Sequence, residues 1–308
     1  MALKVVYRSW GGENEKGRPE GYSKLLCLVS FLRAVEHAGV EVEVVFVNDG
    51  EVAPELRRLM DAHGRVVQLT DARMRGSYWT ALTLATGSDW ADDDVVWFSE
   101  DDYLYRPEAF SALVAATEGP EAVPGEYYAL YASTPGRSVH GPDEPVGAPP
   151  PFWKQLGPYR AGGHDWVRTE STTSSFAARI GALRQDLGIF RICMIPHKNM
   201  LRDHDTGIVL QGYSPYRPYD LLHPLYERGR SLKMRVRDAV ILPFLLATTA
   251  RALRRPSRRR VFLAAAPNLA THMEEQRIAV GTDWHAVAAD VRAWGAQKGL
   301  MSDGVTAR

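Results

Sequence analysis

The sequence predicts an α/β fold in which a mostly parallel sheet is flanked by helices, and three observations predict it. β-branched and aromatic runs have the composition of strands buried on both faces; they lie at residues 4–10, 42–47 and 95–98. Segments with helical periodicity alternate with them, at about 22–38, 54–63 and 77–85. The 308 residues, 45% of them hydrophobic, are enough to bury a sizeable core.

The first expected strand ends in a Gly-rich polar loop, residues 11–21, before the first helix. A loop at the carboxyl end of a strand can hold part of a nucleotide, and Arg8 can meet a phosphate there. An ordinary ion-paired arginine is the alternative for Arg8. The loop has neither the Gly-x-Gly-x-x-Gly nor the Gly-x-x-x-x-Gly-Lys-Ser/Thr pattern, which argues against a dinucleotide-binding Rossmann enzyme and excludes a P-loop NTPase.

The second expected strand ends at Asn48, Asp49 and Gly50. Gly50 can adopt a positive φ, and the Asp49 carboxylate can accept a hydrogen bond from a nucleobase imide or a ribose hydroxyl. The same tripeptide is also common turn chemistry. After the helix at 54–63 and a strand at 65–70, Arg73 and Arg75 offer guanidinium groups that suit phosphates or base edges, although either can form a surface salt bridge instead.

The strand at 95–98 stops at three consecutive carboxylates, Glu100, Asp101 and Asp102. In open α/β sheets, ligands bind beyond the carboxyl ends of the strands, which is where this acidic turn lies. Carboxylates this close repel one another unless something neutralises them, and a hard divalent cation is the usual partner. The turn therefore predicts Mn²⁺ or Mg²⁺ bridging to a diphosphate, with a solvated acidic turn as the alternative.

The acidic turn, the Tyr-Arg-Pro that follows and the expected helix at 108–116 resemble the DXD region of GT-A fold glycosyltransferases, especially family 2-like ones. Three earlier segments agree with that resemblance in order: 4–10, 41–51 and 73–87. It covers residues 3–115 well and becomes looser up to about 225. Two departures are that Asn48-Asp49 replaces the usual pair of Asp residues and that the DXD motif reads Glu-Asp-Asp.

The resemblance implies a GT-A-like (Rossmann-like) fold and a metal-dependent transfer of a sugar from a nucleoside diphosphate donor to a hydroxyl acceptor, which is a glycan, a lipid-linked molecule or a small molecule. Asp102, helped by Glu100 or Asp101, would hold Mn²⁺ or Mg²⁺ on the diphosphate. Asp49 and an arginine from the 73–75 region would hold the nucleoside.

The resemblance also implies a catalytic base at a helix start near residue 203. A carboxylate there is held ionised by the helix dipole and can take a proton from an acceptor hydroxyl, although Asp at a helix start is also a common cap. The pattern allows either Asp203 or Asp205, with Asp205 preferred. His223 has the placement of a histidine that completes the metal shell, and His272 is a second candidate.

Residues 228–260 carry eleven Arg or Lys against one acid, Asp238, around an apolar run at 239–250. The run is too short for a bilayer span, which takes about 20 residues. Basic flanks around apolar residues suit an interfacial segment on an anionic leaflet. A helix buried against the catalytic domain is the alternative, and the absence of interleaved aromatic residues disfavours nucleic acid.

The expected division is a catalytic domain at 1–225, with a nucleotide-sugar half at 1–115 and an acceptor half at 116–225, followed by a basic, amphipathic helical extension at 226–308. Cys27 and Cys193 lack metal-like spacing and are expected to be buried free thiols. The N-terminus has no secretory pattern, so we expect a cytoplasmic protein, peripheral on the inner face of the membrane. Two rivals remain open: a sugar-phosphate nucleotidyltransferase and a non-catalytic nucleotide-sugar-binding module.

Overall fold

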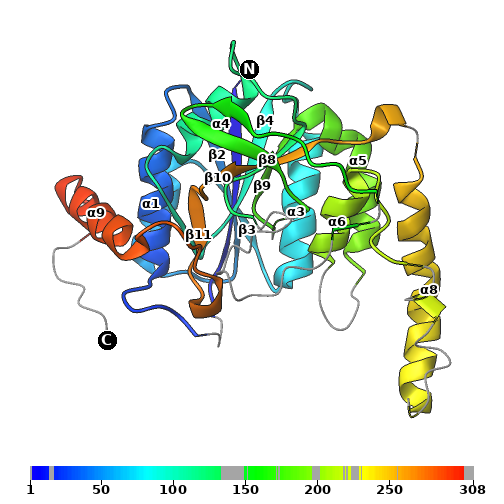
Figure 1. The fold of residues 1–308 in the computed structure, drawn as a ribbon. Helices are drawn as coiled ribbons and strands as arrows, with labels where there is room; N and C mark the ends of the chain where they lie inside the picture. Colours follow the sequence, from blue (N-terminus) through cyan, green and yellow to red (C-terminus); the bar gives the residue numbers. More distant parts are fainter. Residues whose placement is uncertain are drawn as a thin grey trace.

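The computed structural model contains a nine-stranded sheet, a two-stranded sheet and helices on both faces (Figure 1). It describes residues 2–13, 17–132, 149–150, 152–170, 172, 174–195, 202–217, 219, 221–222, 229, 231–254 and 256–301. The strand order in the large sheet is β3-β2-β1-β4-β9-β6-β10-β8-β7.

The first half of the large sheet is parallel throughout. Its strands are β1 (Leu3–Trp10), β2 (Val42–Asp49), β3 (Arg65–Leu69) and β4 (Val95–Glu100). The helices between them are α1 (Lys24–Glu36), α2 (Pro54–His63) and α3 (Arg73–Gly87). Side chains alternate across β1, so Val5 packs in the cluster that contains α1 and α2, while Val6 packs in the cluster that contains α3. The carboxyl ends of these strands therefore form one edge between two helical layers.

The second half of the sheet is mixed. Its strands are β6 (Tyr127–Ala129), β7 (Tyr159–Ala161), β8 (His164–Arg168), β9 (Phe176–Arg179) and β10 (Phe262–Ala266). β9 runs antiparallel to β4 and to β6, whereas β10 runs parallel to β6. Helices α4 (Ala109–Thr117), α5 (Ile180–Cys193) and α6 (Asp203–Leu210) accompany this half. The expected α/β sheet flanked by helices is confirmed, with its parallel character concentrated in the first half.

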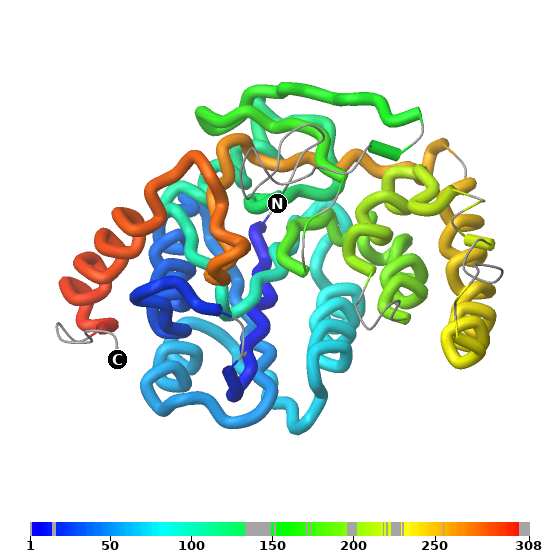
Figure 2. Tube along the Cα trace, turned by 60° about the horizontal axis from the view of Figure 1, so that its bottom comes forward, coloured from blue at the N-terminus to red at the C-terminus, as the bar shows by residue number. Residues whose placement is uncertain are grey.

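The C-terminal segment returns to the body of the protein. β10 lies inside the large sheet, and β11 (Ala270–His272) pairs with β5 (Tyr103–Tyr105). Helix α9 (Trp284–Gln297) packs on α1, and in Figure 2 this orange and red segment runs beside the blue N-terminal part. The sheet therefore does not end at residue 225, and the part of 226–308 that stands away from the body is helix α8 (Leu232–Ala252) (Figure 1).

The core beneath the acidic turn is aromatic. Trp97 of β4 packs edge-on against Tyr105 and Phe110, with ring centroids 6.3 and 6.0 Å apart. The Tyr105 hydroxyl accepts a hydrogen bond from Trp97 Nε1 at 3.2 Å and lies 2.7 Å from the Ser99 hydroxyl. Both cysteines are buried free thiols, as expected.

A buried ion pair holds the end of α8 to the sheet. The Asp186 carboxylate of α5 is 1% exposed and lies 2.6 Å from Arg254 Nη1 and 2.8 Å from Arg260 Nε. The Tyr127 hydroxyl of β6 donates to the same carboxylate at 3.0 Å. Two arginines of the basic stretch are therefore used inside the protein, which sequence reasoning did not foresee.

We expect Asp186→Ala to lower the free energy of unfolding by about 3–5 kcal/mol, because it leaves two arginines of a buried pair without their carboxylate. Urea unfolding followed by tryptophan fluorescence measures this change. The control is Asp61→Ala, which breaks the exposed pair with Arg57 and should cost no more than about 1 kcal/mol. Equal, small losses in both variants would contradict a structural role for Asp186.

Candidate functional site

A cleft of about 530 Å³ lies at the carboxyl edge of the parallel strands. It brings together residues from β1, β2, the start of α3 and the acidic turn. The lining residues are Arg8, Ser9, Trp10, Asp49, Gly50, Asp71, Arg73, Met74, Ser77, Glu100, Asp101 and Asp102. Of the two arginines considered from the sequence, Arg73 lines this cleft, while Arg75 is exposed on α3 and is not among its lining residues.

Each carboxylate of the acidic turn is paired with a cation of the protein. Arg8 of β1 forms an ion pair with Glu100. Lys24, the first residue of α1, lies 2.9 Å from Asp101 Oδ2. Burial raises the pKa of Glu100 and of Asp101 above the ordinary value, although the neighbouring cations act in the opposite direction.

Asp102 has two cationic or polar partners, one from each end of the chain. Arg18 Nη1 donates to Asp102 Oδ2 at 3.2 Å, and His272 Nε2 lies 2.9 Å from the same oxygen. The His272 ring stacks on Tyr103 at 5.0 Å, which fixes its orientation. Burial acts to raise the pKa of Asp102, but the hydrogen bonds and charges of His272 and Arg18 outweigh it and hold the pKa below the ordinary value.

The side chains at Asp102 include groups of the types that bind divalent cations. A carboxylate and an imidazole face each other across 2.9 Å, and Glu100 is the next carboxylate in the cleft. These groups leave no free position for an ion at Asp102 Oδ2, because this oxygen is hydrogen-bonded directly to Arg18 and His272. Within the described part of the chain, no three His, Cys, Asp or Glu side chains are arranged to hold a metal ion. His223, the histidine first expected in the metal shell, lies outside the described residues.

Asp49 joins the end of β2 to the start of α3. Its Oδ1 accepts from the Ala72 backbone N–H at 3.0 Å, and its Oδ2 accepts from the Arg73 backbone N–H at 2.8 Å. Gly50 adopts the expected positive φ, +82°. Arg73 also has a positive φ, +58°, and its exposed side chain reaches Asp71. A carboxylate oxygen accepts more than one hydrogen bond, so Asp49 can hold this turn and still receive a ligand donor from the cleft.

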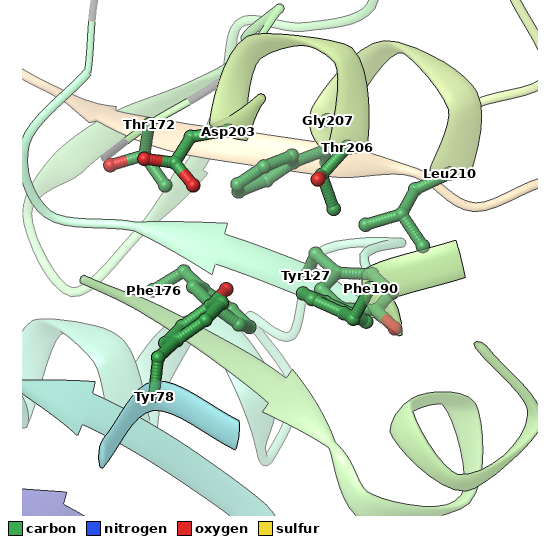
Figure 3. Close-up of a pocket in the computed structure, with 10 residues that line it drawn as sticks. Tyr78, Tyr127, Thr172, Phe176, Phe190, Asp203, Thr206, Gly207 and Leu210 are labelled. Carbon is green, nitrogen blue, oxygen red and sulfur yellow. The ribbon is translucent and has the colours of Figure 1, made fainter. Parts of the chain in front are cut away.

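The two candidate bases at the start of α6 face different surroundings. Asp203 lines a small cavity of about 20 Å³, with Thr172 beside it and the rings of Tyr78 and Phe176 on the opposite side (Figure 3). Asp205 accepts a hydrogen bond from the Tyr216 hydroxyl and lies 3.6 Å from Arg202 Nη1. The geometry therefore favours Asp203, whereas the sequence pattern had favoured Asp205.

Burial among aromatic rings raises the pKa of Asp203 to about 6, and the negative charge of Glu100 adds to this effect while Arg8 opposes it. Asp203 is not among the residues that line the large cleft, but it lies close enough to Glu100 and Arg8 for their charges to act on it. A carboxylate with a pKa near 6 is ionised at neutral pH and still takes up a proton readily. The pKa of Asp203 therefore lies closer to neutrality than that of an ordinary carboxyl group.

Several residues of the site were not singled out from the sequence, among them one aromatic residue and two cations. Trp10 lines the cleft and is 46% exposed. Arg18 and Lys24 reach the acidic turn from the segment after β1. The position of that segment at the carboxyl end of the first strand was the available signal, but the sequence does not show which of its cations turn inward.

We expect Asp203→Asn to stabilise the protein at about pH 8 and to have little effect at about pH 4. The native state binds the Asp203 proton more tightly than the unfolded chain does, so wild-type stability falls as the pH rises from the ordinary carboxyl pKa of 3.8 through about 6. Asp203→Asn has no carboxylate to ionise and does not lose stability in this way. The loss of unfolding free energy in the wild type is at most about 3 kcal/mol, because one pKa unit corresponds to about 1.4 kcal/mol. Urea unfolding at both pH values measures it.

The control for this measurement is Asp61→Asn, whose carboxylate is exposed on α2 and should show the same difference from wild type at both pH values. If Asp203→Asn behaved like this control, the burial of the Asp203 charge would not cost stability.

No protein-family model matches this chain, and no curated protein sequence matches it. Among solved structures, it is similar to residues 1–349 of TarS from S. aureus, with 13% identity and a TM-score of 0.39. That alignment covers 68% of this chain and 54% of the TarS chain, so the chain spans about half of that relative.

Two further solved structures are similar over more of their length. The galactosyltransferase LgtC, in complex with donor and acceptor sugar analogues, has 13% identity and a TM-score of 0.41, over 99% of this chain and 97% of LgtC. A 4-diphosphocytidyl-2C-methyl-D-erythritol synthase has 16% identity and a TM-score of 0.33, over 60% and 78%. These proteins differ in activity, and at these values the similarity assigns none of their activities to this chain.

Proposed function

We propose that this protein is a glycosyltransferase that moves a sugar from a nucleoside diphosphate donor to a hydroxyl acceptor. The observation that carries the proposal is that the cleft with the acidic turn has, close to it, the half-buried carboxylate of Asp203, whose pKa is raised to about 6 by burial and by the charge of Glu100. The acidic turn and its cations would bind a diphosphate, and Asp203 would be the base for the acceptor hydroxyl. The transfer of a hexose is part of the proposal.

The nucleoside end of the donor belongs, in this proposal, beside Asp49 and Arg73. Asp49 can accept from a base imide or a ribose hydroxyl, and Arg73 can reach a base edge or a phosphate from the rim of the cleft. The exposed ring of Trp10 offers a face for stacking. Arg8, Arg18 and Lys24 supply positive charge where the diphosphate would lie.

We also propose Mn²⁺ or Mg²⁺ as a cofactor, with Asp102 and His272 as ligands and Glu100 as a third that would have to move toward them, because no three such side chains of the described residues are arranged to hold an ion. When bound, the ion would neutralise negative charge on the diphosphate as it leaves. Arg18 now donates to the oxygen that the ion needs, so Arg18 has to leave Asp102 first. A departing Arg18 can pair with a phosphate oxygen, which would couple donor binding to the opening of the metal site.

Asp203 acts, in this proposal, as the base of an inverting reaction. It takes the proton of the acceptor hydroxyl while the hydroxyl oxygen attacks the anomeric carbon, and the bond to the nucleoside diphosphate breaks on the opposite side. The aromatic rings around Asp203 limit water at this point and keep the carboxylate basic.

One observation favours a second function, transfer of a nucleotide to a sugar phosphate. Arg18 and Lys24 both reach the acidic turn from the segment after the first strand. Such an enzyme would bind a nucleoside triphosphate and release pyrophosphate, which sets it apart from a glycosyltransferase. A nucleotidyltransferase would have the same fold as a glycosyltransferase, so only ligand experiments separate the two proposed functions.

We expect one nucleoside diphosphate among UDP, GDP, dTDP and CDP to raise the melting temperature of the wild-type protein, and to do so most strongly with Mn²⁺. A ligand that binds only the folded state stabilises it in proportion to the logarithm of its concentration over Kd. Asp102→Asn should abolish the Mn²⁺-dependent part of the shift. Arg18→Ala should lower the Mn²⁺ concentration needed for it, because the competing guanidinium is gone.

Asp61→Asn is the control, since it removes an exposed carboxylate of α2 away from the cleft. Stabilisation by a nucleoside triphosphate with a sugar 1-phosphate, together with pyrophosphate release, would replace the glycosyltransferase proposal by the nucleotidyltransferase one. Stabilisation by a diphosphate with no turnover of its sugar would indicate a binding module. If no nucleotide stabilised the protein with or without metal, both enzymatic proposals would fail.

We expect Asp203→Asn to slow the release of sugar from the donor nucleotide by about a hundredfold or more, the range typical for loss of a general base. The wild-type rate should fall as the pH drops below about 6, where Asp203 becomes protonated. Asp205→Asn, which alters a carboxylate held by Tyr216, is the matched variant and should keep most of the rate. If Asp205→Asn slowed the release of sugar more than Asp203→Asn did, the base would be Asp205.

A further inference from the structure

Helix α8 carries its apolar side chains on the face that points away from the protein. The large apolar side chains on this face are Leu232 (79% exposed), Val236 (56%), Val240 (66%) and Leu246 (49%), followed just after the helix by Leu253 (78%). The four that lie in the helix are spaced four, four and six residues apart, which places them on one stripe. The inward face is formed by Asp238, Leu245, Thr248 and Ala252, which are buried.

This arrangement reverses the usual one, in which the apolar stripe of a surface helix faces the core. A stripe that is exposed from Leu232 to Leu246 has to be explained by something that covers it in the cell. Figure 1 shows α8 at the side of the molecule, with its N-terminal half extending beyond the sheet and the other helices.

The charges around the stripe identify what covers it. Lys233, Arg237 and Arg251 are exposed beside it, and the one acid of the helix, Asp238, is buried on the inward side, where Arg237 pairs with it. A second copy of this chain would bring the same cations against one another. An anionic surface that is apolar beneath its charges complements both features, and an anionic phospholipid bilayer has this composition.

We propose that α8 lies on the surface of an anionic phospholipid bilayer, with Leu232, Val236 and Val240 in the boundary between headgroups and acyl chains. Among the helices that the structure describes, none has the length and apolarity to cross a bilayer. The stripe therefore inserts shallowly and the flanking cations pair with lipid phosphates. This inference concerns α8 alone and holds whether or not the cleft transfers a sugar.

The test is co-sedimentation of the full-length protein with vesicles of phosphatidylglycerol and phosphatidylcholine, compared with vesicles of phosphatidylcholine alone. We expect binding to the anionic vesicles that weakens as salt is added. The double variant Val236→Asp, Val240→Asp should lose this binding, because both positions are exposed and acids there meet the lipid. Val280→Asp places an acid at another exposed apolar position, 46% exposed, and should bind as wild type does.

A second pair of variants tests the charge. Lys233→Gln with Arg251→Gln should weaken binding by about fivefold for each cation, since a cation near an anionic leaflet contributes about 1 kcal/mol. Arg58→Gln with Arg65→Gln removes two exposed cations elsewhere and should change little. Equal binding to both kinds of vesicle, no binding to either, or a wild-type dimer that the Val236→Asp, Val240→Asp variant converts to a monomer would overturn the proposal.

Discussion

The cleft depends on the close packing and partial burial of three adjacent carboxylates at the edge of the sheet. Glu100, Asp101 and Asp102 follow a strand at the centre of the sheet, where loss of solvent opposes their ionised forms. Each is met by a cation from a different segment: Arg8 from β1, Lys24 from α1 and Arg18 from the loop between them. Because these partners precede the turn by more than 75 residues, the ion pairs tie the N-terminal βα unit to the end of β4 and define one wall of the cleft. A highly charged ligand that binds in the cleft would have to replace one partner in these ion pairs.

The C-terminal segment completes the same site from the other side. Strand β11 pairs with β5, immediately after the acidic turn, and this pairing carries His272 to Asp102. Its neighbour β10 is a strand of the main sheet between β6 and β8, and α9 covers α1. The segment from β10 to α9 is therefore part of the body of the protein and reaches the acidic turn through His272, so the expected helical extension from residue 226 also contains strands of both sheets.

The elements that local patterns determine could be predicted, and the pairings between distant segments could not. The expected helix at 54–63 is α2, the strand ending in the acidic turn is β4, and the helix start at Asp203 is the start of α6. The short strands β10 and β11 carry little periodicity, and their pairing partners lie far away in the sequence. For the same reason, the sequence indicated a site at the acidic turn but did not show that Arg18 and His272 contact Asp102. The sequence also did not decide whether Asp203 or Asp205 is the better candidate for the base. That choice depends on the neighbours of each carboxylate in the fold, which are Tyr78 and Phe176 for Asp203 and Tyr216 for Asp205.

The placement of α6 connects the cleft to the outward face of the protein. Asp203 is the first residue of α6, and Arg202, directly before it, is 5% exposed. Arg202 donates to Thr248 Oγ1 of α8 at 2.8 Å and to the Ile195 carbonyl at 2.9 Å. A buried guanidinium whose hydrogen bonds are broken is costly, so Arg202 keeps α8 and the start of α6 at a fixed separation. Asp203, which interacts electrostatically with Glu100 of the acidic turn, is thus linked to α8 through the adjacent Arg202, so a displacement of α8 would act on the backbone next to Asp203.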